Sequence, residues 1–394
     1  MAEDLLLKGI LDGSRAFTGP ETVQFDVTNR CNNNCLCCWN RSPLLGALSV
    51  EKTKEIGCEL PFDVVKRVIE ELKDMGTRTL FFAGGGEPFM HPDIMGILEC
   101  AKYHGMKVCV NTNFTLLDEK RVKKIVELKV DHIHVSLLAG RPESYARMHP
   151  NKTEDTFYKL KELLLYAAYV KKKYGQHMTP PAPHINLYYV ITNINFMDIK
   201  EMAELAQAVE ADSVEFTPVD IIPGKTDMLL LDKGQIEAVS RDVRTQLVRL
   251  ETYSSKEGHI RIFIEQCENF LKRIASPHAA EGKYEHATVP MQPCYTGWAF
   301  ARINASGEVN PCLKASRICV GNIYQSPFCR IWNGETERAF REKSFYLDFK
   351  DTYFCQIGND PGCVSGCLNS CDNIQINLDI HNKYKDILKK HGRI

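Results

Sequence analysis

The sequence predicts an α/β protein, in which a parallel sheet carries helices and is followed by a smaller cysteine-rich module. Between residues 22 and 218, six segments rich in Val, Ile, Phe and Tyr alternate with helical segments. This alternation is typical of a parallel sheet, either doubly wound or curled into an incomplete barrel. From residue 294 onward the pattern changes to a hairpin and cysteine-rich loops. A length of 394 residues suits one large domain and a smaller one.

The predicted elements follow one another along the chain. The strands are expected at residues 22–28, 79–83, 107–112, 132–137, 184–191 and 213–219. The helices between them have apolar stripes of 3.6-residue period, and the helix at 61–76 also has an acid in its first turn and a terminal glycine. Further helices are expected at 233–253 and 263–275, and turn residues predict a hairpin over 298–312. We divide the chain into an N-terminal helix (1–21), the α/β domain (22–230), a helical linker (231–290), the cysteine-rich module (291–375) and a C-terminal helix (376–394).

The composition argues against several classes of protein. The chain has 49 Lys and Arg against 50 Asp and Glu, so no basic field favours nucleic acid or an anionic membrane. The longest apolar stretches have the length of strands, far short of a membrane span. The first residues mix acids with leucines and lack the pattern of a signal peptide. We therefore expect a cytoplasmic protein with neither nucleic acid nor membrane as a partner.

The 16 cysteines are the unusual feature, because clustered thiols in a reducing compartment are more often metal ligands than disulfides. Cys31, Cys35 and Cys38 form a C-x3-C-x2-C pattern in the loop after the first strand. A structural zinc site is the alternative, but closed zinc sites use four ligands, commonly as two separated pairs. Three thiolates instead leave one iron of a [4Fe–4S] cluster open to an outside ligand, whereas four make a closed electron carrier.

A second motif, "GGGEP", follows the second strand at residues 84–88. Glycines allow a backbone to approach a ligand closely, although tight turns need glycine as well. The motif is not a phosphate loop, because no Lys-Ser/Thr pair follows it. By itself the motif is weak evidence.

Together the two motifs resemble the radical S-adenosylmethionine (SAM) superfamily. The resemblance implies that residues 22–230 form a partial (β/α)6 barrel with both motifs at the C-terminal ends of its strands, where such folds bind ligands. It implies that Cys31, Cys35 and Cys38 ligate a [4Fe–4S] cluster and that the amino and carboxylate groups of SAM chelate the open iron. The methionyl amine would meet a further set of residues, namely Gly85, Gly86 and Glu87.

The resemblance assigns further contacts with SAM. Cys37 occupies the position of an aromatic residue near adenine, so Trp39 is expected to replace that residue in part; Cys37 as a fourth ligand is the alternative. The third, fourth and fifth strand ends resemble family segments near SAM, although Phe114 replaces a usual glycine. Ordinary turn and cap roles are the alternative for these polar residues. The residues that these strand ends would contribute are Asn113, Ser136, Thr192 and Asn193.

The C-terminal module resembles the SPASM or shorter Twitch type, which binds auxiliary iron–sulfur clusters. The shared signals are a Cys, Gly-x4-Cys, "GNI…IW" and a terminal Cys-x3-Cys, with zinc as the alternative. The family's Cys-x2-Cys is broken at Gly358. We therefore expect one auxiliary [4Fe–4S] cluster and leave a second open, since Cys319 and Cys329 lie in segments that look like core. The candidate ligands are Cys294 and Cys312 with two of Cys355, Cys363, Cys367 and Cys371.

The resemblance implies an oxidoreductase that cleaves SAM reductively to a 5′-deoxyadenosyl radical, which abstracts hydrogen from a substrate. The auxiliary cluster would accept an electron or ligate the substrate, and a flavodoxin or ferredoxin would act as reductant. Because only about 22 residues precede the first strand, no leader-binding domain is fused, and we expect a sugar, cyclitol or nucleoside substrate. A maturase of a ribosomally made peptide or protein is the alternative, with cross-linking, epimerisation or sulfatase-type oxidation as its reaction. A non-catalytic iron–sulfur or zinc scaffold is the second alternative.

Proton transfer requires a polar group near the barrel mouth or the module interface. Three charged residues in these places are weak candidates, and a solvated or structural charge is the alternative for each. They are Glu215, Asp220 and Arg302.

Overall fold

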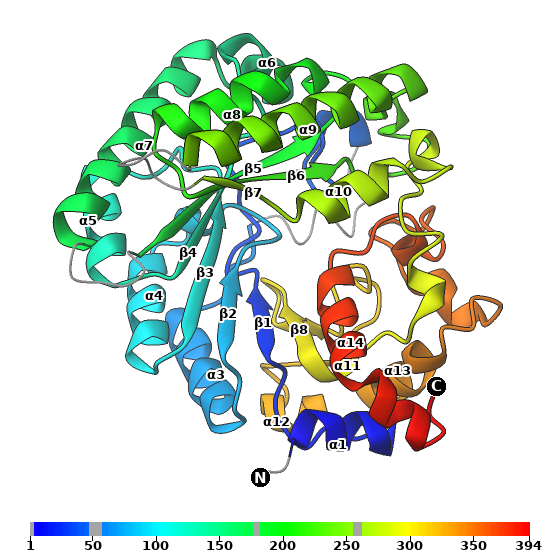
Figure 1. Cartoon of the computed structure of the whole chain (residues 1–394). Coiled ribbons are helices and arrows are strands. Elements are labelled where there is room, and N and C mark those ends of the chain that lie inside the picture. Colours follow the sequence, from blue (N-terminus) through cyan, green and yellow to red (C-terminus); the bar gives the residue numbers. More distant parts are fainter. Residues whose placement is uncertain (1–3, 47–56, 176–181, 255–261) are drawn as a thin grey trace.

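The computed structural model describes residues 4–46, 57–175, 182–254 and 262–394 (Figure 1). Its centre is a ten-stranded sheet in the order β10-β9-β8-β1-β2-β3-β4-β5-β6-β7. From β1 to β7 neighbouring strands pair in parallel, so the predicted α/β fold with a parallel sheet is confirmed. The strands are β1 (Thr22–Phe25), β2 (Thr79–Phe82), β3 (Lys107–Thr112), β4 (His132–Ser136), β5 (His184–Ile191), β6 (Ser213–Pro218), β7 (Phe263–Glu265), β8 (Phe300–Ile303), β9 (Glu308–Asn310) and β10 (Gly321–Asn322).

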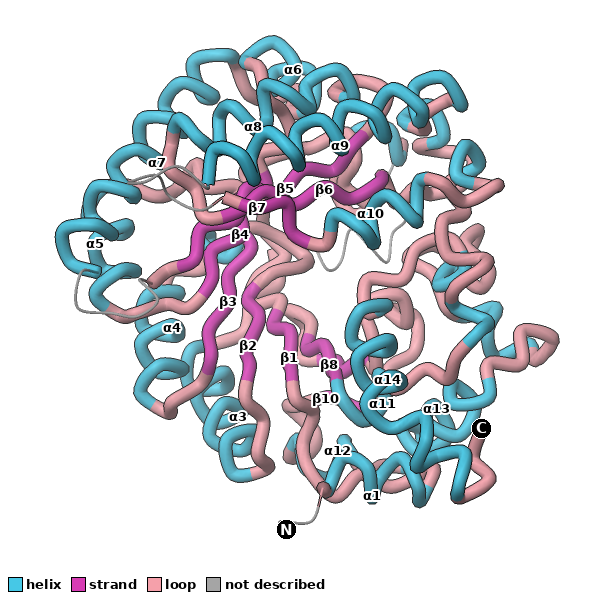
Figure 2. The backbone as a smooth tube through the Cα atoms, in the orientation of Figure 1, coloured by secondary structure: helices cyan, strands magenta, loops and turns pink. Residues whose placement is uncertain are grey.

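Helices cover the outer face of the curled parallel sheet, and Figure 2 shows the remaining helices around the C-terminal module. The barrel helices are α3 (Phe62–Asp74), α4 (Ile94–Tyr103), α5 (Glu119–Glu127), α6 (Pro142–Met148), α7 (Glu154–Gly175), α8 (Ile199–Ala208), α9 (Lys233–Ser254) and α10 (Cys267–Ile274). The others are α1 (Leu5–Asp12), α11 (Thr296–Ala299), α12 (Phe328–Trp332), α13 (Glu335–Tyr346) and α14 (Ile374–Lys390).

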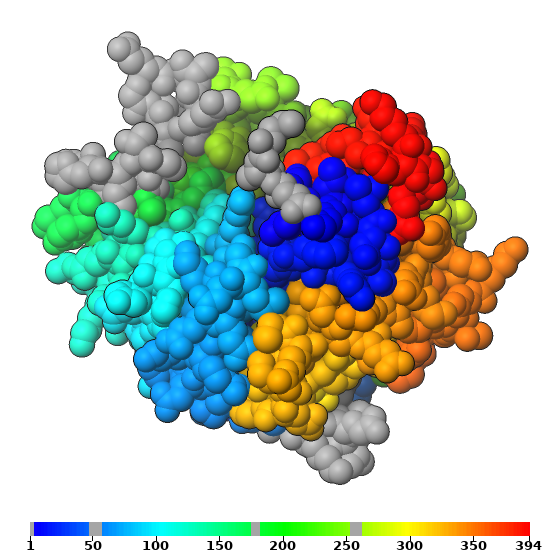
Figure 3. All heavy atoms as spheres, turned by 90° about the horizontal axis from the view of Figure 1, so that it is seen from below, coloured from blue at the N-terminus to red at the C-terminus, as the bar shows by residue number. Residues whose placement is uncertain are grey.

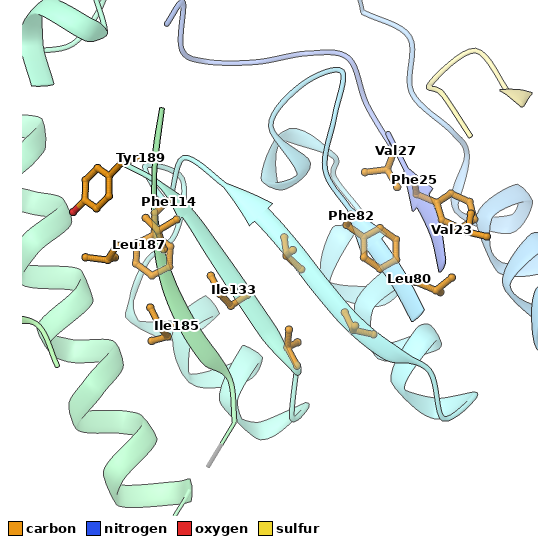
Figure 4. Close-up of a cluster of buried hydrophobic side chains, with 14 of the residues drawn as sticks. Val23, Phe25, Val27, Leu80, Phe82, Phe114, Ile133, Ile185, Leu187 and Tyr189 are labelled. Carbon is orange, nitrogen blue, oxygen red and sulfur yellow. The ribbon is translucent and has the colours of Figure 1, made fainter. Parts of the chain in front are cut away.

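The two faces of the strands carry different side chains, as a period of two requires. On β4, Ile133 and Val135 are buried towards the helices, whereas the alternating residues His132, His134 and Ser136 are half-buried and line the inside of the barrel. Figure 4 shows the buried face, where Phe25 of β1 stacks on Phe82 of β2 with ring centroids 5.9 Å apart. The inner face is polar on this side of the barrel, with His134 and Ser136 on β4. The apolar outer face holds the helices, and the inner face is left for chemistry.

The single helix that we predicted over residues 263–275 is wrong. Phe263–Glu265 forms β7, which pairs in parallel with β6 and buries Ile264 beside Val214. Gln266 then takes a left-handed conformation (φ 49°) and α10 begins at Cys267. The predicted helical linker therefore contributes an edge strand to the barrel.

The hairpin that we predicted in the module is present as β8 and β9, which pair antiparallel. β8 also pairs in parallel with β1, placing Ala301 opposite Val23. The barrel and the cysteine-rich module therefore share one continuous sheet, which the sequence patterns did not indicate.

The expectation that Cys319 and Cys329 lie in the core is wrong, because both are exposed. On α12 the buried residues are Phe328, Ile331 and Trp332, so Cys329 falls on the outer side of this short helix.

The two ends of the described chain pack together (Figure 3). Asp4 caps α1 by accepting a hydrogen bond from the Leu7 N–H at 3.2 Å, and it also accepts one from the Tyr384 hydroxyl of α14 at 2.5 Å. Among the described residues, no helix combines the length and the apolar character that crossing a membrane requires.

Arg341 is a fully buried cation that joins two segments of the module to the N-terminal segment. Its Nε donates to the Gly297 carbonyl at 2.6 Å, and its Nη2 donates to the Trp332 carbonyl at 2.6 Å. Its Nη1 donates to the Ser14 carbonyl at 3.1 Å, and the guanidinium lies 4.6 Å from the centre of the Trp332 ring. The buried Glu337 carboxylate is 3.9 Å away.

Replacing Arg341 by Met (R341M) should lower the free energy of unfolding by about 3–5 kcal/mol, because the carbonyls lose their donor and Glu337 loses its counter-charge. Urea unfolding of the anaerobic protein measures the loss. The matched control is R330M at an exposed position of α12, which should change stability by less than about 0.5 kcal/mol. Equal unfolding midpoints for the two variants would contradict the structural role of Arg341.

Candidate functional site

The loop after β1 gathers the three cysteines of the C-x3-C-x2-C pattern. Burial raises the pKa of Cys35, and the neighbouring thiolates of Cys37, Cys38 and Cys31 raise it further, so these sulfurs lie within electrostatic range of one another. Backbone N–H groups point at two of them: Asn33 N–H donates to Cys31 Sγ at 3.4 Å and Arg41 N–H to Cys38 Sγ at 3.3 Å. Such N–H···S bonds stabilise thiolate ligands of iron–sulfur clusters.

Cys37 lies in a different environment from its neighbours. It packs with Leu36 against an apolar cluster of Val219, Ile221 and Leu229. Burial raises its pKa to about 12, with a further contribution from Cys38. This apolar setting suits a packed thiol better than a fourth ligand.

The glycine turn after β2 presses against the loop after β1. A Cβ at Gly84 would lie 1.6 Å from Asp26 Oδ1, and one at Gly86 would lie 2.1 Å from the Arg30 carbonyl oxygen. Glu87 N–H donates to that carbonyl at 2.8 Å, and the Gly85 carbonyl accepts from Asn40 Nδ2 at 2.8 Å. The glycines are therefore required for the close approach of the turn to the cysteine loop.

The Glu87 carboxylate, predicted to meet the amine of SAM, is turned into the protein. It is 2% exposed and accepts hydrogen bonds from Thr112 Oγ1 at 2.7 Å, Asn113 N–H at 2.7 Å and Phe89 N–H at 3.1 Å. Burial raises the pKa of Glu87, and these three donors oppose the rise. The side chain therefore fastens the end of β3 to the turn after β2.

The other strand ends also carry the polar residues that the sequence singled out. Asn113 Nδ2 donates to Asn32 Oδ1 in the cysteine loop at 2.8 Å. The next residue, Phe114, has a φ of 62°, the left-handed conformation that a glycine would adopt without strain. Ser136 Oγ donates to Asn111 Oδ1 at 2.7 Å on the inner face of the barrel.

Thr192 and Asn193 make turn contacts after β5. Thr192 N–H donates to Asn195 Oδ1 at 2.7 Å, and Asn193 Nδ2 donates to the Met228 carbonyl at 2.6 Å. Sequence reasoning missed Asn195, which is fully buried and donates to the carbonyls of Leu138 and Val190 at 2.7 and 2.8 Å. The sequence signal that could have identified Asn195 is its position two residues after Asn193, in the turn at the end of a strand.

Arg302 and Trp39 meet between the barrel and the module. Arg302 Nε donates to the buried Asp26 at 2.8 Å, and its guanidinium lies 5.3 Å from the centre of the Trp39 ring. Trp39 also packs against Leu45 and Cys363, which joins the cysteine loop to the module. Arg302, a candidate for proton transfer, is therefore engaged in a buried ion pair.

Glu215 faces the inside of the barrel, in a layer where Ser136 of β4, Tyr188 of β5 and Glu215 of β6 lie side by side. Its Oε2 accepts from Asn186 Nδ2 at 2.8 Å and lies 4.0 Å from His134 Nδ1. Burial, with the nearby charge of Glu265, raises the pKa of Glu215 to about 7. Burial lowers the pKa of His134 to about 4. Glu215 is therefore a carboxyl group that exchanges a proton near neutral pH.

Four cysteines of the module come together in the structure. Burial raises the pKa of Cys371 most, and Cys294, Cys367 and Cys312 raise it further by their charge. Burial likewise raises the pKa of Cys367 to about 12, with Cys294 as the next cause. The electrostatic contacts therefore link four sulfurs from three separate loops.

Cys355 and Cys363 lie apart from this group. Cys355 is exposed, and Cys363 packs against Trp39 and Ile222. Arg317 donates to the carbonyls of both, at 2.8 Å for Cys355 and 3.2 Å for Cys363. The Arg317 side chain thus holds this loop together by hydrogen bonds to the carbonyls of the loop's main chain.

Lys314 and Asp220 form a buried ion pair at the junction of barrel and module. Burial raises the pKa of Asp220, and Lys314 opposes the rise. Asp220 has a cationic partner and Arg302 has an anionic one, so neither of these proton-transfer candidates is a free charge.

Among the described residues, neither cysteine group has the arrangement of a zinc site. A zinc ion needs its ligands around one point, at about 2.0–2.3 Å. Among the described residues, no three Cys, His, Asp or Glu side chains are arranged in that way. In a cubane cluster each thiolate binds a different iron, so the sulfurs surround a volume larger than one ion.

Comparison with known proteins agrees with this geometry. The profile of the Radical SAM superfamily matches residues 25–206, and that of the SPASM iron–sulfur cluster-binding domain matches residues 294–358. The chain is 22% identical over 364 residues to the tungsten-containing aldehyde ferredoxin oxidoreductase cofactor-modifying protein of Pyrococcus furiosus, covering 88% of this chain and 94% of that one. It is 26% identical over 323 residues to the PqqA peptide cyclase of Granulibacter bethesdensis, covering 80% and 74%.

Two solved structures share the fold. Streptococcus suis SuiB bound to its precursor peptide SuiA aligns with a TM-score of 0.59 and 15% identity, covering 92% of this chain and 75% of that one. anSMEcpe with bound AdoMet aligns with a TM-score of 0.60 and 17% identity, covering 95% and 100%.

The cofactors follow from the two domains: a [4Fe–4S] cluster with SAM in the barrel, and auxiliary iron–sulfur chemistry in the module. The two profiles match successive parts of the chain, and these parts share one sheet. The protein therefore belongs to the radical SAM superfamily of enzymes and carries a C-terminal SPASM domain.

Proposed function

We propose that this radical SAM enzyme modifies a peptide or protein substrate by abstracting hydrogen from one of its carbon atoms. The observation that carries the proposal is the similarity to proteins whose names specify peptides. These are a PqqA peptide cyclase among the relatives and, among the solved structures, SuiB with its precursor peptide and anSMEcpe with a bound peptide. A sugar, cyclitol or nucleoside, which we expected first, has less support. The relatives named as modifying a cofactor or making heme keep a non-peptide substrate as the second candidate.

We assign the ligands from the grouping of the sulfurs. Cys31, Cys35 and Cys38 would hold the cluster with the open iron, and Gly85 and Gly86 would present their backbone to the amine of SAM. When bound, the reduced cluster and SAM supply a 5′-deoxyadenosyl radical that takes a hydrogen atom from the substrate. The remaining SAM contacts that we assign are Trp39, Asn113, Ser136, Thr192 and Asn193.

The protein's own residues orient the site and move the proton. Glu87 fixes the turn after β2 against β3, so the Gly85 and Gly86 backbone keeps its position. Glu215, inside the barrel beside Tyr188, would accept the proton that an oxidation releases. Cys294, Cys312, Cys367 and Cys371 would hold one auxiliary cluster, and a flavodoxin or ferredoxin would supply electrons.

Changing Cys31, Cys35 and Cys38 together to Ala should lower the iron content of the anaerobically reconstituted protein from about eight to about four atoms per chain, since each cluster holds four. The same variant should make no 5′-deoxyadenosine from SAM and dithionite, because the open iron is gone. Iron and sulfide analysis and liquid chromatography measure both effects. 5′-Deoxyadenosine formed at the wild-type rate by the triple variant would refute the assignment of the three cysteines.

Single substitutions distinguish the ligands of the auxiliary cluster from the neighbouring cysteines. C367A and C371A should each lose the auxiliary irons, about four per chain, whereas C355A and C363A should keep the wild-type content of about eight. Cys355 and Cys363 are matched controls, because they lie in the same loop but outside the sulfur group. A wild-type content of about twelve irons, reduced in C355A, would show a second auxiliary cluster instead.

The substrate class is tested with an extract of the organism that encodes the chain. The extract should stimulate 5′-deoxyadenosine formation by the reconstituted enzyme by at least about fivefold, and digestion of the extract with proteinase K, later inhibited, should abolish the stimulation, because a peptide substrate is destroyed. A mock-digested extract is the control. Stimulation that survives digestion would assign a small molecule.

A further inference from the structure

Glu265 is a carboxylate inside the barrel to which the proposed function gives no role. It lies on β7 directly opposite Glu215 of β6 in the parallel pairing, so both side chains point to the same face of the sheet. Neighbouring strands lie about 4.8 Å apart, which makes the two carboxyl groups neighbours. Like charges directly opposite each other on adjacent strands are destabilising, so this pair requires a physical explanation.

Two donors hold Glu265 in its ionised form. His184 Nε2 lies 2.8 Å from Glu265 Oε1, and the Ser213 hydroxyl contacts the same oxygen at 2.7 Å. Burial alone would raise the pKa of Glu265, but the hydrogen bonds from His184 and Ser213 outweigh burial, and the pKa is lowered. Glu265 is therefore a negative charge at neutral pH.

Glu215 has a weaker set of partners. Its Oε2 accepts from the neutral amide of Asn186 at 2.8 Å, and His134 Nδ1 is 4.0 Å away. The same amide also donates to His134 Nδ1 at 3.0 Å, so this nitrogen presents a lone pair and not an N–H group to the carboxylate. Burial and the charge of Glu265 raise the pKa of Glu215 to about 7. Two carboxyl groups whose proton affinities are separated by their surroundings are typical of acid–base catalysis.

Two neutral side chains connect the two carboxyl groups. The Ser213 hydroxyl contacts Asn186 Oδ1 at 3.0 Å as well as Glu265, and Asn186 Nδ2 donates to Glu215. Neither carboxyl group can turn away from the other without breaking one of these hydrogen bonds. The repulsion between them is therefore built into the fold.

Charged and titratable groups of the neighbouring elements also face the pair. Arg273 opposes the rise in the pKa of Glu215, but its guanidinium is itself paired with Glu285 at 2.6 Å. The groups are Lys107 of β3, His132 and His134 of β4, His184 and Tyr188 of β5, and Arg273 of α10.

We propose that Glu265 is a positioning residue whose fixed negative charge makes Glu215 a base strong enough to take the proton that the substrate releases. This inference rests on the proposed function. The substrate loses a hydrogen atom to the deoxyadenosyl radical and one electron to the auxiliary iron–sulfur cluster, which a flavodoxin- or ferredoxin-type carrier reoxidises. The bond between the oxidised substrate and one proton then breaks, and an O–H bond forms on Glu215. The proton later passes to water, to which the Glu215 side chain is 16% exposed.

The test is an infrared titration of the anaerobically reconstituted full chain without substrate. The carboxyl band that is missing from E215Q identifies Glu215. At pH 7, E265Q should lower the ratio of protonated to ionised Glu215 at least about fivefold, because the neighbouring negative charge is gone. E265D keeps that charge and should stay within about twofold of the wild-type ratio.

The matched control is E268Q, which removes a negative charge from an exposed position of α10 three residues further along the chain. It should leave the ratio unchanged. Equal ratios for wild type and E265Q would overturn the role of Glu265. If E265Q does not fold, E265A removes the same charge and decides in its place. A wild-type Glu215 that titrates at the ordinary pKa of a glutamate would also overturn the inference.

This result is separable from the test of the substrate class. The titration needs no substrate, so a stimulation that survives proteinase K would refute the peptide substrate and leave the shift between wild type and E265Q in place. Conversely, the absence of that shift would refute the role of Glu265 and leave the protease sensitivity of the stimulation in place.

Discussion

The buried ion pair between Asp26 and Arg302 holds the functional end of the molecule together. Asp26 comes directly after β1 and lies against Gly84 of the turn after β2, where no side chain fits. Arg302 comes from β8 and also covers the Trp39 ring of the cysteine loop. One interaction thus fixes the cysteine loop, the glycine turn and the module relative to each other. A buried pair of this kind is costly to break, because either partner alone would leave an uncompensated charge.

The strands and the first cysteine group were predictable because both depend on local pattern. Runs of β-branched and aromatic residues placed β1 to β6 within two or three residues of their observed bounds. Residues 263–275 were misassigned because a strand of three residues leaves no periodicity, and its partner β6 is far away in sequence. Cys329 was misplaced because a helix of five residues shows its buried face only after packing. These errors share one cause: the deciding contacts are between distant segments.

The auxiliary ligands show the same limit at the level of the site. The spacing could not decide which two of four cysteines are ligands, because all four lie close together in the sequence. These are Cys355, Cys363, Cys367 and Cys371. In the folded chain the four cysteines fall into two groups. Arg317 donates hydrogen bonds to the carbonyls of Cys355 and Cys363. Cys367 and Cys371 lie near Cys294 instead. Glu87 is a second example. The motif identified this residue, but only the structure shows that its carboxylate accepts hydrogen bonds from Thr112 and Asn113.

The parallel pairing of β8 with β1 has a consequence for how such enzymes diversify. A module tethered by a linker is exchanged between barrels simply by recombining genes. Here the module contributes a strand to the barrel's own sheet, with Ala301 opposite Val23. A transplanted module therefore needs a recipient whose first strand offers a compatible edge, and a chimera without that match would expose two unpaired strand edges to aggregation.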